Sequence, residues 1–147
     1  MAGATNLWEL DVLDLIFTNQ AAPNMGDAGG LLPSASPGDM AIALHTGNTI
    51  SETSTVQTEA EAAYTGYVRQ NVARALAQWT VAGDGVVDND NEINFVISTS
   101  GPETETDVSL SGFAGVMQMF ASLDADLVVN SGVTPIFAAQ ALAISLD

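Results

Sequence analysis

Short apolar runs separated by turn-forming clusters fill the chain from residue 40 onward, and they limit the folds it can adopt. The run Glu92–Ser98 is the strongest strand pattern, because Ile93, Phe95 and Ile97 alternate onto one face. Turn clusters interrupt the runs at 46–48, 83–85 and 130–132. About six to eight such strands predict an antiparallel β-sandwich, jelly-roll-like, or a barrel. A βαβ fold would need several helical segments, and the pattern supplies one.

That helix is predicted over residues 6–18, ahead of the strands. Asn6 and Glu9 have the spacing of a capping box, and Leu7, Leu10 and Phe17 follow the helical period. Further apolar residues widen the stripe, so we expect the helix to be covered on more than one side. Residues 19–39 hold three prolines and four glycines, which predicts a long surface connection or extended arm.

The predicted organisation is therefore one structural domain, with a helix and arm at 1–39 and a β-sandwich at 40–147. Segment 49–62 and the run Ser100–Thr106 are polar and are predicted to be loops. The predicted strands are Met40–His45, Ala63–Arg74, Leu76–Ala82, Glu92–Ser98, Leu123–Val129, and parts of Val108–Phe120 and Ile136–Asp147.

The run Ala63–Arg74 carries both basic residues of the chain, Arg69 and Arg74. Gly66 lies between Tyr64 and Tyr67, where a bulge or a close backbone approach would require glycine. Neither face of the run is cleanly apolar, which favours cover by a loop or another subunit. We leave two roles open for the arginines: internal ion pairs, or bidentate contacts across an interface.

Charge narrows the possible partners. The chain has 2 Lys and Arg residues against 18 Asp and Glu, a net charge of −16. Nucleic acid and anionic membrane surfaces are poor partners for such a chain. A basic protein surface, a hydrophobic seam or cations suit it better. Without cysteine, disulfides and thiolate metal sites are excluded. No apolar run approaches a membrane span, and no basic signal region opens the chain, so we expect synthesis in a cytoplasm from Met1 or Ala2.

Candidates for chemistry are few. His45 is the single histidine, and no nucleophile motif accompanies it, so we expect a hydrogen-bonded structural residue. The acidic run Asp84–Glu92 offers oxygen ligands to calcium but lacks EF-hand spacing, so we expect turns. The pairs Glu59/Glu61 and Glu103/Glu105 lie in polar context, and we expect solvated charge there. No catalytic site, cofactor or metal site is predicted.

Five segments of the sequence together resemble a family of small tailed-bacteriophage virion proteins, whose members are labelled tail fibre or capsid decoration protein. They are AIALHTG (41–47), AYTGYVRQNVARA (63–75), WTVAG (79–83), INF (93–95) and VNSGVTPIFAAQALAISLD (129–147). Y-T-G-Y-x-R at 64–69 and V-T-P-x-F-A-A at 133–139 are the most specific parts. The sequence departs from the family pattern in its long segment 19–39 and at Gln140, where glycine is usual. The resemblance implies a β-sandwich virion component that is not an enzyme.

Three functions follow, in order of preference. The first is a capsid decoration (cement) protein on the capsid exterior, bound to the major capsid protein and to copies of itself as a trimer or dimer. The second is a tail fibre or tail-tip adaptor subunit, although the chain shows no heptads or β-helix repeat. The third is a carbohydrate-binding module. The expected interface residues are Leu7, Trp8, Leu10, Val12, Phe17, Tyr64, Tyr67, Arg69 and Arg74.

Overall fold

The computed structural model describes residues 4–83, 85–112 and 115–146, and it is mostly β with antiparallel sheets. The protein chain forms two compact units. The first unit comprises Met1–Asp39, Ala73–Ile93 and Phe137–Asp147, and the second comprises Met40–Val72 and Asn94–Ile136. Each unit is discontinuous, because it is built from segments that are not adjacent in the sequence. The division into 1–39 and 40–147 stays a prediction.

The first unit begins with the predicted helix. An α-helix, α1 (Asn6–Leu13), continues into a π-helical turn, η1 (Asp14–Thr18), which confirms a helix over 6–18. Its N-cap is Thr5, not Asn6, and the Thr5 hydroxyl accepts from the N–H of Trp8. Because the cap lies one residue earlier, Glu9 is out of register for the expected capping box. Asn19 ends the helix in the left-handed conformation, at φ 55°.

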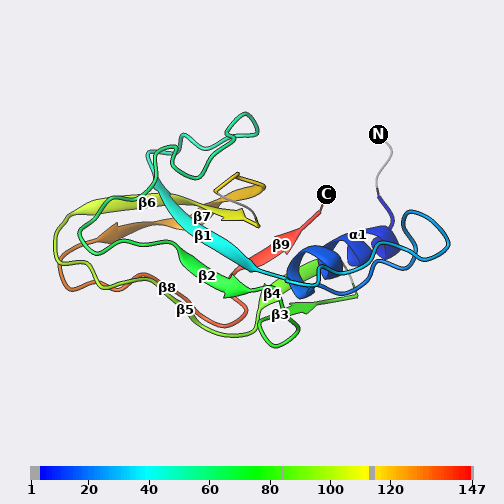
Figure 1. Ribbon diagram of the computed structural model, residues 1–147. Coiled ribbons are helices and arrows are strands. Elements are labelled where there is room, and N and C mark those ends of the chain that lie inside the picture. The colour runs from blue at the N-terminus through cyan, green and yellow to red at the C-terminus, as the bar shows by residue number, and fades with distance from the viewer. Residues whose placement is uncertain (1–3, 84, 113–114, 147) are drawn as a thin grey trace. The chain divides into compact units, whose positions relative to one another are not determined.

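Three strands form the sheet of the first unit: β3 (Trp79–Val81), β4 (Val86–Asn89) and β9 (Ala143–Ser145). β4 is central and antiparallel to both neighbours. Figure 1 shows α1 beside β3 and β4, and the core forms where the Phe17 ring meets Trp79 edge-on at 5.0 Å. The run Leu76–Ala82 was predicted to be a strand throughout, but residues 75–78 form a turn.

Segment 19–39 is a surface connection that folds back on its own unit, and an extended arm is not confirmed. Ala22 and Leu31 form an antiparallel bridge across it. The Asn19 amide exchanges two hydrogen bonds of 2.9 Å with the backbone of Ser34. The N–H of Asn24 donates to the Asp11 carboxylate in α1. Prolines and glycines prevent regular structure here, yet these contacts satisfy the backbone locally.

The second unit contains a four-stranded sheet in the order β2 (Gln70–Ala73), β1 (Asp39–Thr46), β6 (Glu103–Ser111) and β7 (Met119–Val129). All four strands are labelled in Figure 1. β1 and β6 are antiparallel, with Ala41 opposite Ser111 and Leu44 opposite Val108. Two sequence predictions are wrong here. β6 begins at Glu103, so residues 103–106 are strand rather than loop. Only the last part of the run Ala63–Arg74 is strand.

β7 is the last strand in this order, and its pairing with β6 is interrupted. Glu105 pairs with Leu127 and Asp107 with Ser122, so the stretch 123–126 bulges out opposite a single residue of β6. Asp124 and Asp126 are exposed within that bulge. A bulge and acidic side chains are features that protect a sheet edge from further pairing.

The remaining strands are short: β5 (Ile93–Asn94) pairs with β8 (Ile136–Phe137). The predicted strand Glu92–Ser98 therefore ends early, and Ile97 is exposed although Ile93 and Phe95 are buried. The expectation for Gly66 is confirmed as a close backbone approach. Its φ is +103°, and an added Cβ would lie 3.0 Å from the Ile97 carbonyl oxygen. Within the described residues, no helix has the length and apolar character needed to cross a membrane.

Candidate functional site

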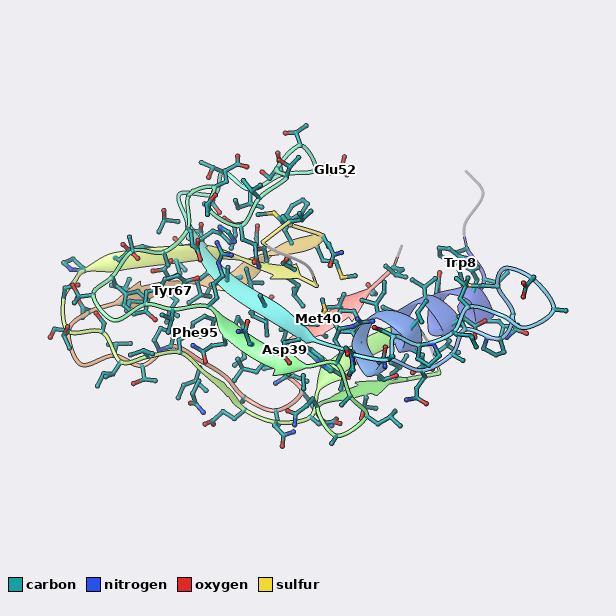
Figure 2. All side chains as sticks on the ribbon, in the orientation of Figure 1. Trp8, Asp39, Met40, Glu52, Tyr67 and Phe95 are labelled. Atoms are coloured by element: carbon teal, nitrogen blue, oxygen red, sulfur yellow. The ribbon has the colours of Figure 1, made fainter. Side chains whose placement is uncertain are left out.

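The predicted interface residues divide into exposed and internal sets. Leu7 and Trp8 on the first turn of α1 are 56% and 45% exposed, and Trp8 is marked at that end of the helix in Figure 2. Leu10 and Val12 are half-buried. Phe17 is fully buried against Trp79 and offers no surface. The most exposed apolar side chains of the helix therefore lie on its first turn.

Arg74 is used inside the first unit. Its guanidinium donates to the carbonyl oxygens of Leu15, Ile16 and Pro37. The first two are among the last carbonyls of the helix, which lack partners within it. A cation at the C-terminal end of a helix also matches the helix dipole. Arg74 therefore fixes the end of η1 and the chain near Pro37.

Arg69 has an equivalent internal role in the second unit. Its Nε and Nη2 donate to the two oxygens of Glu61 at 2.6 and 2.7 Å, a bidentate pair. The hydroxyl of Tyr67 donates to Glu61 at 3.1 Å and accepts from the N–H of Leu44. The Tyr67 ring also stacks with Phe95, and both are labelled in Figure 2. Arg69 thus makes the internal ion pair that was one of its two predicted roles, whereas Arg74 hydrogen-bonds to backbone carbonyls of its own unit.

His45 is a buried structural residue, as expected from the sequence. Its Nδ1 lies 2.8 Å from the carbonyl oxygen of Glu59, which can only accept, so Nδ1 carries the proton. Nε2 then accepts from Ser109 Oγ at 2.7 Å, and the Gln57 amide donates to the same Oγ at 3.2 Å. Burial lowers the pKa of His45, against the raising effects of the Glu59 carbonyl and the Glu61 and Asp107 charges. The neutral ring is therefore the native form.

The Ser109–His45 pair has the spacing of a nucleophile and its general base, but not the surroundings. Both residues are 0% exposed, so a substrate cannot reach Oγ. Asp107 does not orient the imidazole. Its carboxylate instead accepts from Thr106 at 2.7 Å and from Ser122 at 2.9 Å. The group holds β1, β6 and β7 together with hydrogen bonds.

Glu105 corrects the expectation that the carboxylate pairs are solvated. It is 0% exposed, and neither carboxylate oxygen has a hydrogen-bond donor. Burial raises the pKa of Glu105 to about 8, with further contributions from the hydrogen bond and charge of Glu103. The Tyr64 hydroxyl is also buried without a partner, and burial raises the pKa of Tyr64 to about 12. Tyr64 is thus internal rather than part of an exposed interface.

The candidate cation run does not gather as a metal site. Asp84 lies outside the described residues. Asp88 and Asn89 belong to β4, and Asp90 accepts from the Thr80 hydroxyl. The buried Asn89 amide donates to the carbonyls of Asn91 and Ala138 and accepts from the N–H of Leu142. Across residues 4–83, 85–112 and 115–146, no cluster of three or more acidic or histidine side chains could hold a metal ion.

Sequence reasoning missed Gln57, Ser109 and Glu105, which are all completely buried. Gln57 and Glu105 lie in polar stretches that were assigned to loops. One signal was present for Glu105, because Thr104, Thr106 and Val108 alternate along the strand with the β-branched residues that sheets favour. Gln140, where the resembled family usually has glycine, adopts φ 63° in the turn before β9, a conformation natural to glycine.

In a comparison with known protein families, residues 3–145 match the family described as podophage GP4 fiber I protein gp80. A comparison with curated proteins gave no match. The match spans nearly the whole chain, both units included. It favours the fibre interpretation over the capsid decoration one that the sequence had placed first. The chain belongs to the podophage GP4 fiber I protein family, a family of tailed-bacteriophage virion structural proteins.

Proposed function

We propose that this chain is a structural subunit of a tail fibre and that it works by binding other virion proteins. The family match over residues 3–145 carries the proposal. The buried Ser109–His45 pair supports a non-catalytic role, because its two reactive groups face the interior of the second unit. The antiparallel sandwich remains our proposal for the packing of the sheets.

The first turn of α1 is the proposed binding surface. Leu7 and Trp8 project apolar side chains into solvent there, while Leu13 and Phe17 are fully buried. Tryptophan is enriched among the residues that dominate binding energy at interfaces. Glu9 adds a carboxylate to the same turn. We therefore propose a partner with an apolar pocket and basic side chains around it.

The binding partners and the oligomeric state of the chain are part of the proposal. Copies of the same chain are one partner, in a trimer or dimer, and a tail protein is the other. A net charge of −16 opposes association between like surfaces, so apolar contacts must provide the attraction between copies.

Location in the particle tests the fibre assignment. Heads and tails would be separated from purified virions, and the chain quantified in each by mass spectrometry. We expect it in the tail fraction, at a few copies per particle. Recovery with the head shells at high copy number would instead support the decoration function and overturn the proposal.

Substitution of the exposed helix turn tests the binding surface. In phage carrying L7A together with W8A, we expect severalfold fewer copies of the chain per virion. The free energy of unfolding of the isolated variant should change by only about 0.5 kcal/mol, because both side chains are exposed. Leu32→Ala is the matched control, since Leu32 is an exposed leucine of the same unit outside the helix. Equal incorporation of both variants would exclude the helix turn as the binding surface.

A further inference from the structure

Glu103 and Glu105 lie on the same face of β6. Residues two apart in a strand point to the same side, so the two carboxyl groups are neighbours. Glu105 is completely buried, while Glu103 is partly exposed. Two neighbouring carboxylates repel each other strongly when one is removed from water, and this repulsion is relieved if one of them holds a proton.

The hydrogen bonds of the pair are unequal. Glu103 Oε1 accepts from the N–H of Ala63 at 2.7 Å and from the N–H of Tyr64 at 3.0 Å. Neither oxygen of Glu105 accepts from any donor. A buried carboxylate without donors is costly, whereas a neutral carboxyl group can itself donate. Glu103, two residues away on the same face of β6, is the neighbouring acceptor, and its interaction with Glu105 raises the Glu105 pKa.

Two further observations mark this place in the sheet. The Tyr64 hydroxyl, buried and without a partner, interacts electrostatically with both acids. In addition, the pairing of β6 with β1 and with β7 shifts register between Glu105 and Asp107. The sheet is therefore irregular on both sides of β6 next to Glu105. A change in the charge of this side chain acts where regular pairing is already interrupted.

We infer that Glu103 and Glu105 share one proton, with Glu105 as the neutral donor to Glu103, the residue that itself accepts from the N–H groups of Ala63 and Tyr64. Loss of the proton places two negative charges at the buried end of the contact. It removes the donor that ties Glu105 to Glu103 and so weakens the second unit. The pair is a pH-sensitive contact built into the sheet.

The direction of the pH effect follows from the Glu105 pKa. It is raised from 4.5 to about 8 in the folded protein, first by burial and then by Glu103. A group whose folded pKa is raised contributes stability that is complete below its unfolded pKa. That stabilising contribution is lost progressively as the pH rises from about 4.5 to about 8. Above about pH 8, no further stability is lost through Glu105.

Other ionisable groups nearby belong to a different cluster. On β6, Asp107 bonds to Thr106 and Ser122. On β1, His45 interacts with Asp107, Glu61 and Arg69. On β7, Leu127 lies opposite Glu105, with Asp126 exposed beside it in the bulge. The groups that act on the Glu105 pKa are Glu103 and the buried surroundings, and Tyr64 is neutral over the whole pH range of interest.

The test compares wild-type protein with E105Q, which keeps the shape of the side chain and a donor but cannot ionise. Urea unfolding would be measured from pH 5 to pH 9. We expect the ratio of the two unfolding constants to change by up to about tenfold per pH unit. The total change should reach at least about tenfold by pH 8 and then stop. Glu52→Gln, which removes an exposed carboxyl of the same unit, is the control and should show no such window (Figure 2).

A second measurement does not depend on the stability of a variant. The infrared spectrum of the wild-type protein at pH 7 should contain the carbonyl band of a neutral carboxylic acid, and E105Q should lack it. E103Q should move the upper end of the stability window to lower pH, because Glu103 raises the Glu105 pKa. A constant ratio across pH 5–9, or an acid band that persists in E105Q, would overturn the inference. So would a window that calcium chloride abolishes, because a cation rather than a proton would then neutralise the pair.

Discussion

The two units bury polar side chains to different extents. The first unit is built mainly on apolar packing, with Leu13, Phe17 and Trp79 at 0% exposure, although the polar side chain of Asn89 is buried there too. The second unit also has apolar residues inside, but it buries His45, Gln57 and Glu105 among them at 0% exposure. The first unit thus depends mainly on the removal of apolar surface from water, whereas the second also depends on hydrogen bonds between buried polar groups, such as those of Gln57, Ser109 and His45.

This difference predicts which changes should lower the stability of each unit. Apolar contacts tolerate small shifts and lose stability in proportion to the volume removed. When the partner of a buried polar group is removed, the desolvation cost of that group is no longer offset by a hydrogen bond, and the protein loses stability by that full amount. The second unit should therefore be sensitive to single polar atoms and to pH, and the first unit to changes of size.

Trp79→Ala should have the largest effect, because it removes the ring that packs against Phe17 and the Nε1 donor to the Ala73 carbonyl. We expect the free energy of unfolding to fall by about 3–5 kcal/mol. Chemical denaturation followed by circular dichroism measures this. Leu76→Ala, at an exposed position in the same stretch, should cost about 0.5 kcal/mol or less. Similar losses for both would show that the first unit does not depend on this packing.

Ser109→Ala should have an intermediate effect in the second unit. It removes one oxygen atom, which joins the Gln57 amide to His45 Nε2. We expect a loss of about 1–3 kcal/mol, because His45 Nε2 would be left buried without a donor. Ser51→Ala is the control, since the Ser51 hydroxyl lies in an exposed turn and bonds to Thr53. A neutral S109A would remove the contrast between the two units.

The smallest effect is the acid sensitivity of His45. Burial lowers its folded pKa below 6.5, so the stability that comes from the neutral ring is present above about pH 6.5. It is lost as the pH falls toward the folded pKa, by at most about 1.4 kcal/mol per pH unit. Because His45 is the single histidine, its ring signals in an NMR titration report this pKa without assignment by mutation. A midpoint at or above 6.5 would contradict the prediction. The sign is opposite to that expected for Glu105.

Sequence patterns predicted the parts of the molecule in which the local signal and the tertiary environment agree. The helix over 6–18 follows from its apolar period, and the close approach at Gly66 follows from a glycine between aromatic residues. The structural role of His45 followed from the lack of any accompanying motif. In each case a short stretch of sequence contained the reason for the structure.

The polar interior of the second unit could not be predicted in this way. The stretch Glu103–Asp107 is acidic, and an acidic stretch is normally exposed. Its burial depends on partners distant in sequence, such as Ala63 and Tyr64 for Glu103. The internal roles of Arg69 and Arg74 were left open for the same reason, since the acceptors of Arg74 include Leu15, which lies far away in the chain.

The bulge in β7 limits how this protein can join others. β7 carries two exposed aspartates, Asp124 and Asp126, where its pairing with β6 is interrupted, so a strand from another molecule would meet negative charge and a misaligned backbone. Edge-to-edge pairing of sheets from different molecules, as in amyloid, is therefore disfavoured at this strand. Along the β7 edge, another molecule would therefore have to bind through side chains rather than by adding a strand.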